Sequence, residues 1–180
     1  MTHAGTLFTP KLRLLTLAAV LSLPMAALAD DYADVNQLAR SGKVAEALAK
    51  ADQYLAAKPR DPQMRFLKGV LQSETGRTAD AIATFSSLTQ EYPELPEPYN
   101  NLAVLYAGQS EFDKARVALE SAVRANPSYA IAYENLGDVY AKLAAVSYSK
   151  AQQLDARNAT VQPKLALVRQ LFPAAAPKAR

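Results

Sequence analysis

The chain has 180 residues but no cysteine and no tryptophan, and its only histidine is His3. Without cysteine it can form neither disulfides nor a thiol nucleophile, and no lipid can be attached through a cysteine at the N-terminus. Beyond residue 3, serine–histidine–aspartate triads and zinc sites built on histidine and cysteine are excluded as well. The six glycines are dispersed, which excludes a glycine-rich phosphate loop. We therefore predict no catalytic residue, no metal site and no cofactor.

One pair of neighbouring carboxylates, Glu94 and Glu97, could serve an enzyme that works with carboxylates alone. The pair flanks a leucine and a proline in a segment that we expect to be an exposed loop. Such an enzyme would lose turnover when either glutamate is replaced. We predict instead that the protein is not an enzyme.

The sequence contains a repeat in which four kinds of position recur at one constant step: a proline, an alanine, a turn residue and a small residue. The prolines are Pro59, Pro93 and Pro127; the alanines are Ala47, Ala81 and Ala115; the turn residues are Gly42, Gly76 and Ser110; the small residues are Val35, Gly69, Ala103 and Gly137. A period of this length, about 34 residues, predicts a solenoid of helical hairpins.

Each column has a physical reason within a hairpin. Two antiparallel helices approach closely only where small side chains meet, so Gly69, Ala103 and Gly137 are expected to face Ala81 and Ala115. Glycine supplies the turn between the two helices. Each proline ends the second helix, because its ring disfavours helical geometry in the preceding residue and it has no N–H to donate.

Residues 96–129 carry the repeat most completely, with a fixed order of large, aliphatic, small, aromatic and alanine positions before the proline. These residues are Tyr99, Leu102, Ala103, Tyr106, Ala115, Leu119, Ala122 and Pro127. The order resembles the tetratricopeptide repeat. The resemblance implies an all-α solenoid of three to four repeats, at about 30–61, 62–95, 96–129 and a shortened 130–157. In the second unit, Lys68 and Gln72 stand where apolar residues are expected.

The N-terminus has the features of a secretory signal peptide. Lys11 and Arg13 precede an apolar stretch, and a small-residue site predicts cleavage after Ala29. The alternative is an uncleaved anchor, since roughly 17 apolar residues lie near the lower limit for spanning a bilayer. Cleavage would give a periplasmic or secreted protein without stable membrane insertion. Without the leader, which contains Lys11 and Arg13, residues 30–180 carry 18 basic and 17 acidic residues. The resulting net charge of about +1 does not favour nucleic acid as a partner.

The fourth unit departs from the period, because the alanine expected one period after Ala115 is replaced by Ser149. No glycine or proline lies between Gly137 and Asp155, which predicts one long helix over about 131–155. A kink near Ala144 that restores a compressed hairpin is the alternative.

Downstream of the fourth unit, apolar residues recur at helical spacing and predict a capping helix over about 160–172. They are Val161, Leu165, Val168, Leu171 and Phe172. Residues 173–180 are predicted to be a disordered tail.

In the family that the chain resembles, the first helices of successive hairpins line a concave groove. The resemblance implies that this groove is formed by Phe66, Val70, Asn100, Val104, Glu134 and Asp138, with Asn101 and Asn135 beside them. Asn101 and Asn135 could hold a partner's backbone, or could form a local hydrogen bond between neighbouring hairpins. The four tyrosines of the first helices are expected to be core packing. They are Tyr99, Tyr106, Tyr133 and Tyr140.

These features predict an adaptor of the bacterial cell envelope that binds a peptide or helix of another envelope protein. The groove lacks the lysines and arginines with which the best-known peptide-binding members hold a carboxylate. Acidic residues favour a basic or neutral segment instead: Glu74, Glu97, Glu134 and Asp138. The alternative is a structural protein that self-associates, for example as a homodimer, through the long fourth-unit helix near Tyr148 and Ala151.

Overall fold

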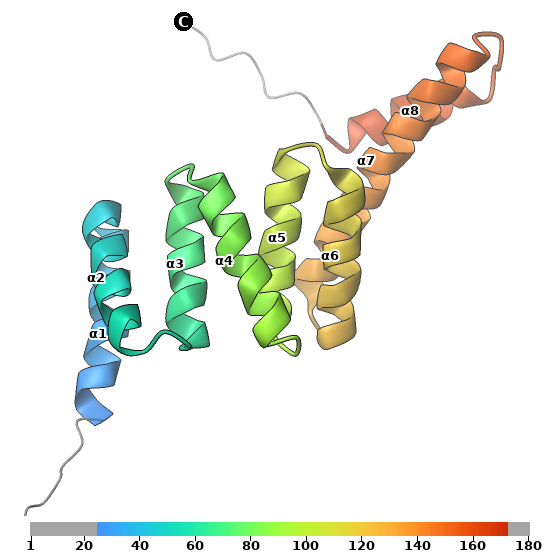
Figure 1. Cartoon of the computed structure of the whole chain (residues 1–180). Coiled ribbons are helices and arrows are strands. Elements are labelled where there is room, and N and C mark those ends of the chain that lie inside the picture. The colour runs from blue at the N-terminus through green and yellow to red at the C-terminus, as the bar shows by residue number, and fades with distance from the viewer. Residues whose placement is uncertain (1–24, 173–180) are drawn as a thin grey trace, which may run out of the picture.

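The computed structural model describes residues 25–172, with side chains from residue 31 onward. The predicted leader therefore lies outside the described residues except for 25–29, which open the first helix, and the predicted tail lies outside them entirely. Every regular element in the described part is an α-helix (Figure 1). The helices are α1 (Met25–Arg40), α2 (Val44–Ala57), α3 (Pro62–Glu74), α4 (Thr78–Glu91), α5 (Pro96–Gly108), α6 (Phe112–Ala125), α7 (Ala130–Leu154) and α8 (Val161–Gln170).

The helices form successive hairpins that stack side by side (Figure 1). Each helix packs against the next one in the chain, and the first helices of neighbouring hairpins also touch, α3 with α5 and α5 with α7. This arrangement confirms the predicted all-α solenoid. No helix in the described part combines the length and apolar character needed to cross a membrane.

The turn column has the backbone geometry that ends the first helix of each hairpin. Gly42, Gly76 and Ser110 all have positive φ, at 77°, 73° and 62°. In the second hairpin the N–H of Gly76 donates to the Ser73 carbonyl at 3.0 Å, and the next N–H reaches back to Gln72 at 2.9 Å. The same pair of bonds recurs in the other two hairpins. These Schellman turns explain the glycines, and they place Ser110 in a conformation that its side chain disfavours.

The proline column also behaves as predicted. Helices α2, α4 and α6 each end two residues before their proline, at Ala57, Glu91 and Ala125. Two other prolines, Pro62 and Pro96, begin helices α3 and α5. At the first helical position the N–H has no partner within the helix, so proline loses no hydrogen bond there.

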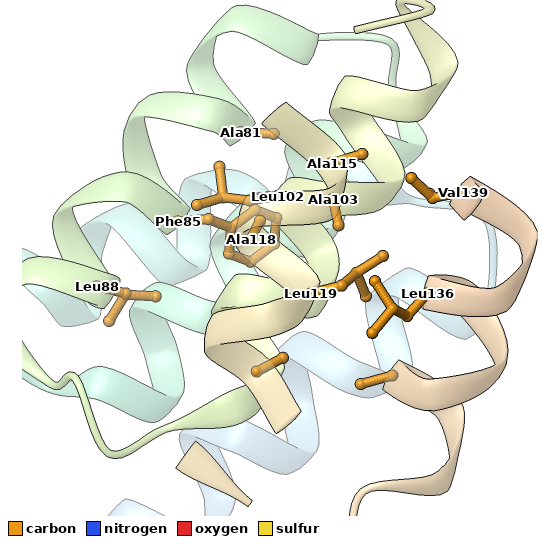
Figure 2. Close-up of a cluster of buried hydrophobic side chains, with 12 residues drawn as sticks. Ala81, Phe85, Leu88, Leu102, Ala103, Ala115, Ala118, Leu119, Leu136 and Val139 are labelled. Atoms are coloured by element: carbon orange, nitrogen blue, oxygen red, sulfur yellow. The ribbon is translucent and has the colours of Figure 1, made fainter. Parts of the chain in front are cut away.

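The buried apolar side chains form two clusters, one over α1 to α3 and the other over α4 to α7, of which Figure 2 shows the second. In the second hairpin the fully buried Phe85 of α4 lies over Gly69 of α3, so closely that a β-carbon at Gly69 would stand 2.7 Å from the ring. In the third hairpin Ala103 and Ala115 are both buried. The small-residue column therefore sets the close approach of the helices in both hairpins.

The two polar residues at apolar positions of the second unit have partners. Lys68 forms an ion pair with Asp52 at 2.6 Å, and the buried Gln72 side chain accepts a hydrogen bond from Thr84 at 2.8 Å. These contacts satisfy the polar groups without a change of fold.

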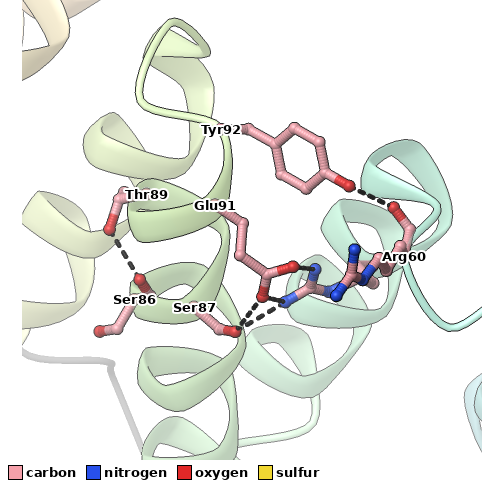
Figure 3. A network of polar contacts seen from close by, with 7 residues as sticks. Arg60, Ser86, Ser87, Thr89, Glu91 and Tyr92 are labelled. Atoms are coloured by element: carbon pink, nitrogen blue, oxygen red, sulfur yellow. Dashed lines mark hydrogen bonds and ion pairs between the residues drawn. The ribbon is translucent and has the colours of Figure 1, made fainter.

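A polar cluster fixes the α3–α4 hairpin at its open end (Figure 3). The Arg65 guanidinium donates to both carboxylate oxygens of Glu91, at 2.9 and 2.8 Å, and Ser87 donates to the same carboxylate at 2.9 Å. Hydrogen bonding from Arg65, assisted by Ser87, lowers the pKa of Glu91 to about 2. The Tyr92 hydroxyl donates to the Arg60 carbonyl and joins the end of α4 to the connection between α2 and α3.

The fourth unit contains one uninterrupted helix, α7, of 25 residues. This confirms the prediction of a long helix and not the kinked hairpin. No second helix of the described chain returns along the first half of α7. The prediction that Gly137 faces a second helix and that Tyr133 and Tyr140 pack in the core is therefore wrong. Gly137 has no neighbour within 4 Å of a β-carbon placed on it, and Tyr133 and Tyr140 are 50 % and 48 % exposed. Tyr99 and Tyr106, which α6 covers, are half-buried as expected.

The predicted capping segment forms α8, which packs along the second half of α7 (Figure 1). Val161 and Leu165 are buried, and Val168 and Phe172 are half-buried. Leu171 is exposed, so its assignment to the apolar face was wrong. Helix α8 ends at Gln170, directly before Leu171.

Candidate functional site

A hollow of about 470 Å³ lies between α5 and α7, on the face formed by the first helices of the hairpins. It is closed at one end by Ser110 of the α5–α6 turn and by Phe172, two residues beyond the end of α8. We call it the α5–α7 hollow. Its lining residues are Ala103, Val104, Ala107, Ser110, Phe112, Leu119, Asn135, Asp138, Val139, Lys142 and Phe172.

The hollow owes its depth to small side chains on α5. Ala103 and Ala107 lie one helical turn apart, so neither fills the space that α7 faces. The buried Leu119 and Val139 complete an apolar floor. Such a floor can accommodate an apolar side chain of a partner.

Three of the predicted groove residues meet at this hollow: Val104, Asn135 and Asp138. Val104 is 53 % exposed although it belongs to a helix that is mostly packed. Asp138 is exposed on α7, one turn from Lys142. The hollow thus offers an apolar floor with one carboxylate and one ammonium group at its rim.

The asparagines are engaged within the protein. The Asn135 amide donates to the Asn100 side-chain oxygen at 2.8 Å, between neighbouring hairpins, and Asn100 is buried. This is the local inter-hairpin bond that stood as the alternative to a grip on a partner. The Asn101 amide donates at 2.9 Å to the Glu97 carbonyl of its own helix. Both amides hold the first helices in place.

The remaining predicted residues are spread over other surfaces. Phe66 and Val70 are half-buried against the core, and the Phe66 ring lies 5.5 Å from that of Phe85. Phe66 also lines a smaller hollow of about 340 Å³ between the starts of α3 and α5, together with Glu97. Glu134 is exposed on α7 and lines neither hollow.

Lys142 and Phe172 are residues of the hollow that the sequence analysis did not select. The Lys142 ammonium lies 3.9 Å from the centroid of the Phe172 ring, a cation–π contact that closes the hollow at the end of α8. Lys142 lies one helical turn after Asp138, a predicted groove residue, so helical spacing could have identified it. Nothing in the repeat pattern indicates that the chain after α8 returns to this place.

The site has no feature of a metal centre. Within residues 25–172, no three side chains of histidine, cysteine, aspartate or glutamate are grouped closely enough to hold a metal ion.

Comparison with a curated relative adds independent information. The tetratricopeptide repeat domain-containing protein PYG7, chloroplastic, of Arabidopsis thaliana is 33% identical over 76 residues, which is 39% of this chain. The chain spans only 25% of the length of that relative.

Solved structures share the fold. A thermophilic tetratricopeptide-repeat protein of Thermus thermophilus superposes with a TM-score of 0.58 at 23% identity, over 79% of this chain and 81% of that one. The first such domain of Spaghetti (RPAP3), solved with an HSP90 peptide bound, has a TM-score of 0.58 at 16% identity, over 62% of this chain and 88% of the other.

Two sequence models described as tetratricopeptide repeat match the chain, one over residues 32–96 and the other over 74–143. Together they cover more than half of the chain, and they include the second half of α1, helices α2 to α6 and the first half of α7. With its repeat columns, its Schellman turns and its stacked hairpins, the chain belongs to the tetratricopeptide-repeat family.

Proposed function

We propose that this protein is a non-enzymatic adaptor that binds a segment of another protein in the α5–α7 hollow. The observation that carries the proposal is the combination of an apolar floor with the exposed Val104 and Asp138 at its rim. Proteins of this family generally act as scaffolds. The peptide bound by the Spaghetti domain supports peptide recognition by this fold.

The hollow favours a particular kind of segment. An apolar side chain would fill the floor, and basic or neutral neighbours would suit Asp138 at the rim. The Spaghetti domain binds a peptide, SRMEEVD, that is rich in carboxylates. Here the ammonium group at the hollow, that of Lys142, is stacked on Phe172. We therefore expect an apolar anchor with a basic flank.

The proposal includes export. The signal peptide that the sequence predicts over residues 1–29 supports an adaptor that works in the periplasm or outside the cell, on another envelope protein. The intact mass of the native protein tests this step, because cleavage after Ala29 gives a chain that begins at Asp30. A mass that includes the leader would contradict it.

The binding test uses two valines that are equally exposed. Val104 lies in the hollow and Val117 lies on α6, and each is 53 % exposed. Peptides selected on the wild-type protein from a random library should bind the Val104→Glu variant at least tenfold more weakly, and the Val117→Glu variant unchanged. Asp138→Lys should weaken the binding of peptides with a basic flank and leave the binding of neutral peptides unchanged.

Circular dichroism of each variant confirms that the helices are intact. The proposal fails if the selected peptides bind Val104→Glu as tightly as wild type. It also fails if Val117→Glu loses binding to the same extent, because the recognition surface would then lie elsewhere.

A further inference from the structure

The first half of α7 has a face that no helix of the described chain covers. Its residues Tyr133, Gly137 and Tyr140 follow Tyr99, Ala103 and Tyr106 by one repeat period each. In the third hairpin α6 covers those positions, and in the second hairpin α4 sets Phe85 over Gly69. On α7 both tyrosines are about half exposed and the glycine between them is open. We call these three residues the uncovered α7 face.

A glycine at this place needs an explanation. Gly137 lies inside a 25-residue helix and does not have positive φ, so no turn requires it. No atom lies within 4 Å of a β-carbon placed there, so no contact within the described chain requires it either. An exposed glycine inside a helix is less stable than alanine. A glycine here would, however, permit the close approach of a helix that is not part of the described chain.

Helix α8 does not serve this purpose, because it packs on the second half of α7. Lys164 of α8 lies over the Tyr148 ring, and Arg169 donates to Ser149. Tyr148 and Ala151 are consequently half-buried, so they are less available for association than the sequence suggested. Of the nine large hydrophobic residues exposed in the described part, seven lie at or beyond residue 131. Apolar surface is therefore concentrated on this end of the solenoid.

The two flanks of the uncovered face differ in charge. On one flank α6 presents Arg116 and Glu120, joined at 2.6 Å, and Arg124 one turn later; Glu120 also accepts from the Tyr140 hydroxyl at 3.2 Å. The hydrogen bond from Arg116 lowers the pKa of Glu120, which remains charged at neutral pH. On the other flank Glu134 of α7 is exposed. Arg116 is balanced by Glu120 and by the nearby Asp113, so the exposed Arg124 is the positive charge that the first flank offers, and Glu134 is the negative charge of the second.

We propose that a second copy of this chain covers the uncovered α7 face, with the two α7 helices packed against each other at Gly137. A twofold axis parallel to the helices sets the α6 flank of each copy against Glu134 of its partner, so that opposite charges meet on both sides. A second copy has α2, α4 and α6 already packed in its own hairpins. The same α7 face is then its available apolar partner, as a twofold interface requires.

The α5–α7 hollow stays open in such a dimer. Asp138 and Lys142, which line the hollow, lie on a different side of α7 from Tyr133 and Tyr140. The dimer would present two hollows to one partner chain and would bind repeated segments more tightly than a single copy. The inference does not depend on what the hollow binds.

The test measures the oligomeric state of the protein as isolated, by sedimentation equilibrium over a wide concentration range. We expect a dimer, and Tyr140→Lys should raise its dissociation constant at least tenfold. Gly137→Ala should also raise it several-fold. That variant favours the helical state of the monomer, so its loss of association cannot reflect unfolding. Gly108→Ala is the matched control, since Gly108 is exposed and equally open, and it should leave the dimer unchanged.

The charge arrangement has its own test. Glu134→Arg should weaken the dimer, and adding Arg124→Glu in the same chain should restore it, because the exchanged charges meet again across the twofold axis. A protein that remains monomeric at all concentrations overturns the proposal. So does a dimer that Tyr140→Lys and Gly137→Ala leave intact, or a crosslinker at Tyr133 that captures only other proteins.

Discussion

Gly69 and Gly137 occupy the same column of the repeat but should respond in opposite ways to alanine. A β-carbon at Gly69 would stand 2.7 Å from the ring of the fully buried Phe85, whereas one at Gly137 would meet nothing within 4 Å. Both residues lie inside helices and neither has positive φ. Any difference between the two variants therefore reports the presence or absence of a covering helix.

The magnitudes follow from two opposing terms. Replacing a glycine inside a helix by alanine stabilises the fold by about 0.5–1 kcal/mol. Forcing a methyl group into a packed core costs about 1–3 kcal/mol. Gly137→Ala has only the first term and should raise the free energy of unfolding by about 0.5–1 kcal/mol. Gly69→Ala has both, so it should lie below Gly137→Ala by about 1–3 kcal/mol.

Urea unfolding followed by circular dichroism measures both values. The protein is kept at a concentration low enough to be monomeric, so that association at α7 does not contribute to the stability. If Gly137→Ala destabilises the monomer as much as Gly69→Ala does, then a helix covers α7 and the account of the fourth unit is wrong. If Gly69→Ala is as stabilising as Gly137→Ala, the close contact with Phe85 is wrong.

Two further predictions concern the turns and the pH dependence. Ser110 has a φ of 62° where the other turns use glycine, so Ser110→Gly should raise the free energy of unfolding by about 1 kcal/mol in urea titrations; an unchanged or lower value would contradict the turn geometry. Hydrogen bonds from Arg65 and then Ser87 hold the pKa of Glu91 at about 2, below its ordinary value of 4.5. Because the folded pKa is the lower one, the contribution of Glu91 to stability is complete above about pH 4.5 and is lost as the pH falls toward 2. Glu91→Gln should flatten the stability profile over that range; a profile identical to that of the wild type would show that Arg65 does not hold the carboxylate in solution.

The repeat columns are enough to predict the helical hairpins. Each turn residue, proline and small residue acts on the backbone within a few positions, so its effect can be read locally. The absence of glycine and proline after Gly137 likewise predicts α7, because nothing interrupts its backbone hydrogen bonds. The same columns fail for Tyr133 and Tyr140. A repeat position indicates which side of a helix is apolar, but whether another helix covers that side depends on the rest of the chain.

The lining of the α5–α7 hollow could be predicted from the sequence only in part. The resemblance named Val104 and Asp138, which lie one period apart on α5 and α7, and Lys142 lies one helical turn after Asp138. It does not predict that Phe172 closes the hollow, since the direction in which α8 returns along α7 is set by packing and not by the repeat. The resemblance also named Phe66, whose ring packs against Phe85 of α4 and at the same time lines the smaller hollow between α3 and α5.

The central claim is that the α5–α7 hollow is where this protein meets its partner. A photo-reactive amino acid placed at Val104 or at Val117, two positions of equal exposure, tests it in living cells. The account predicts that position 104 crosslinks to a segment of one partner protein, with an apolar residue at the site of attachment, and that position 117 does not. Equal crosslinking from both positions, or crosslinking from position 117 alone, would contradict it.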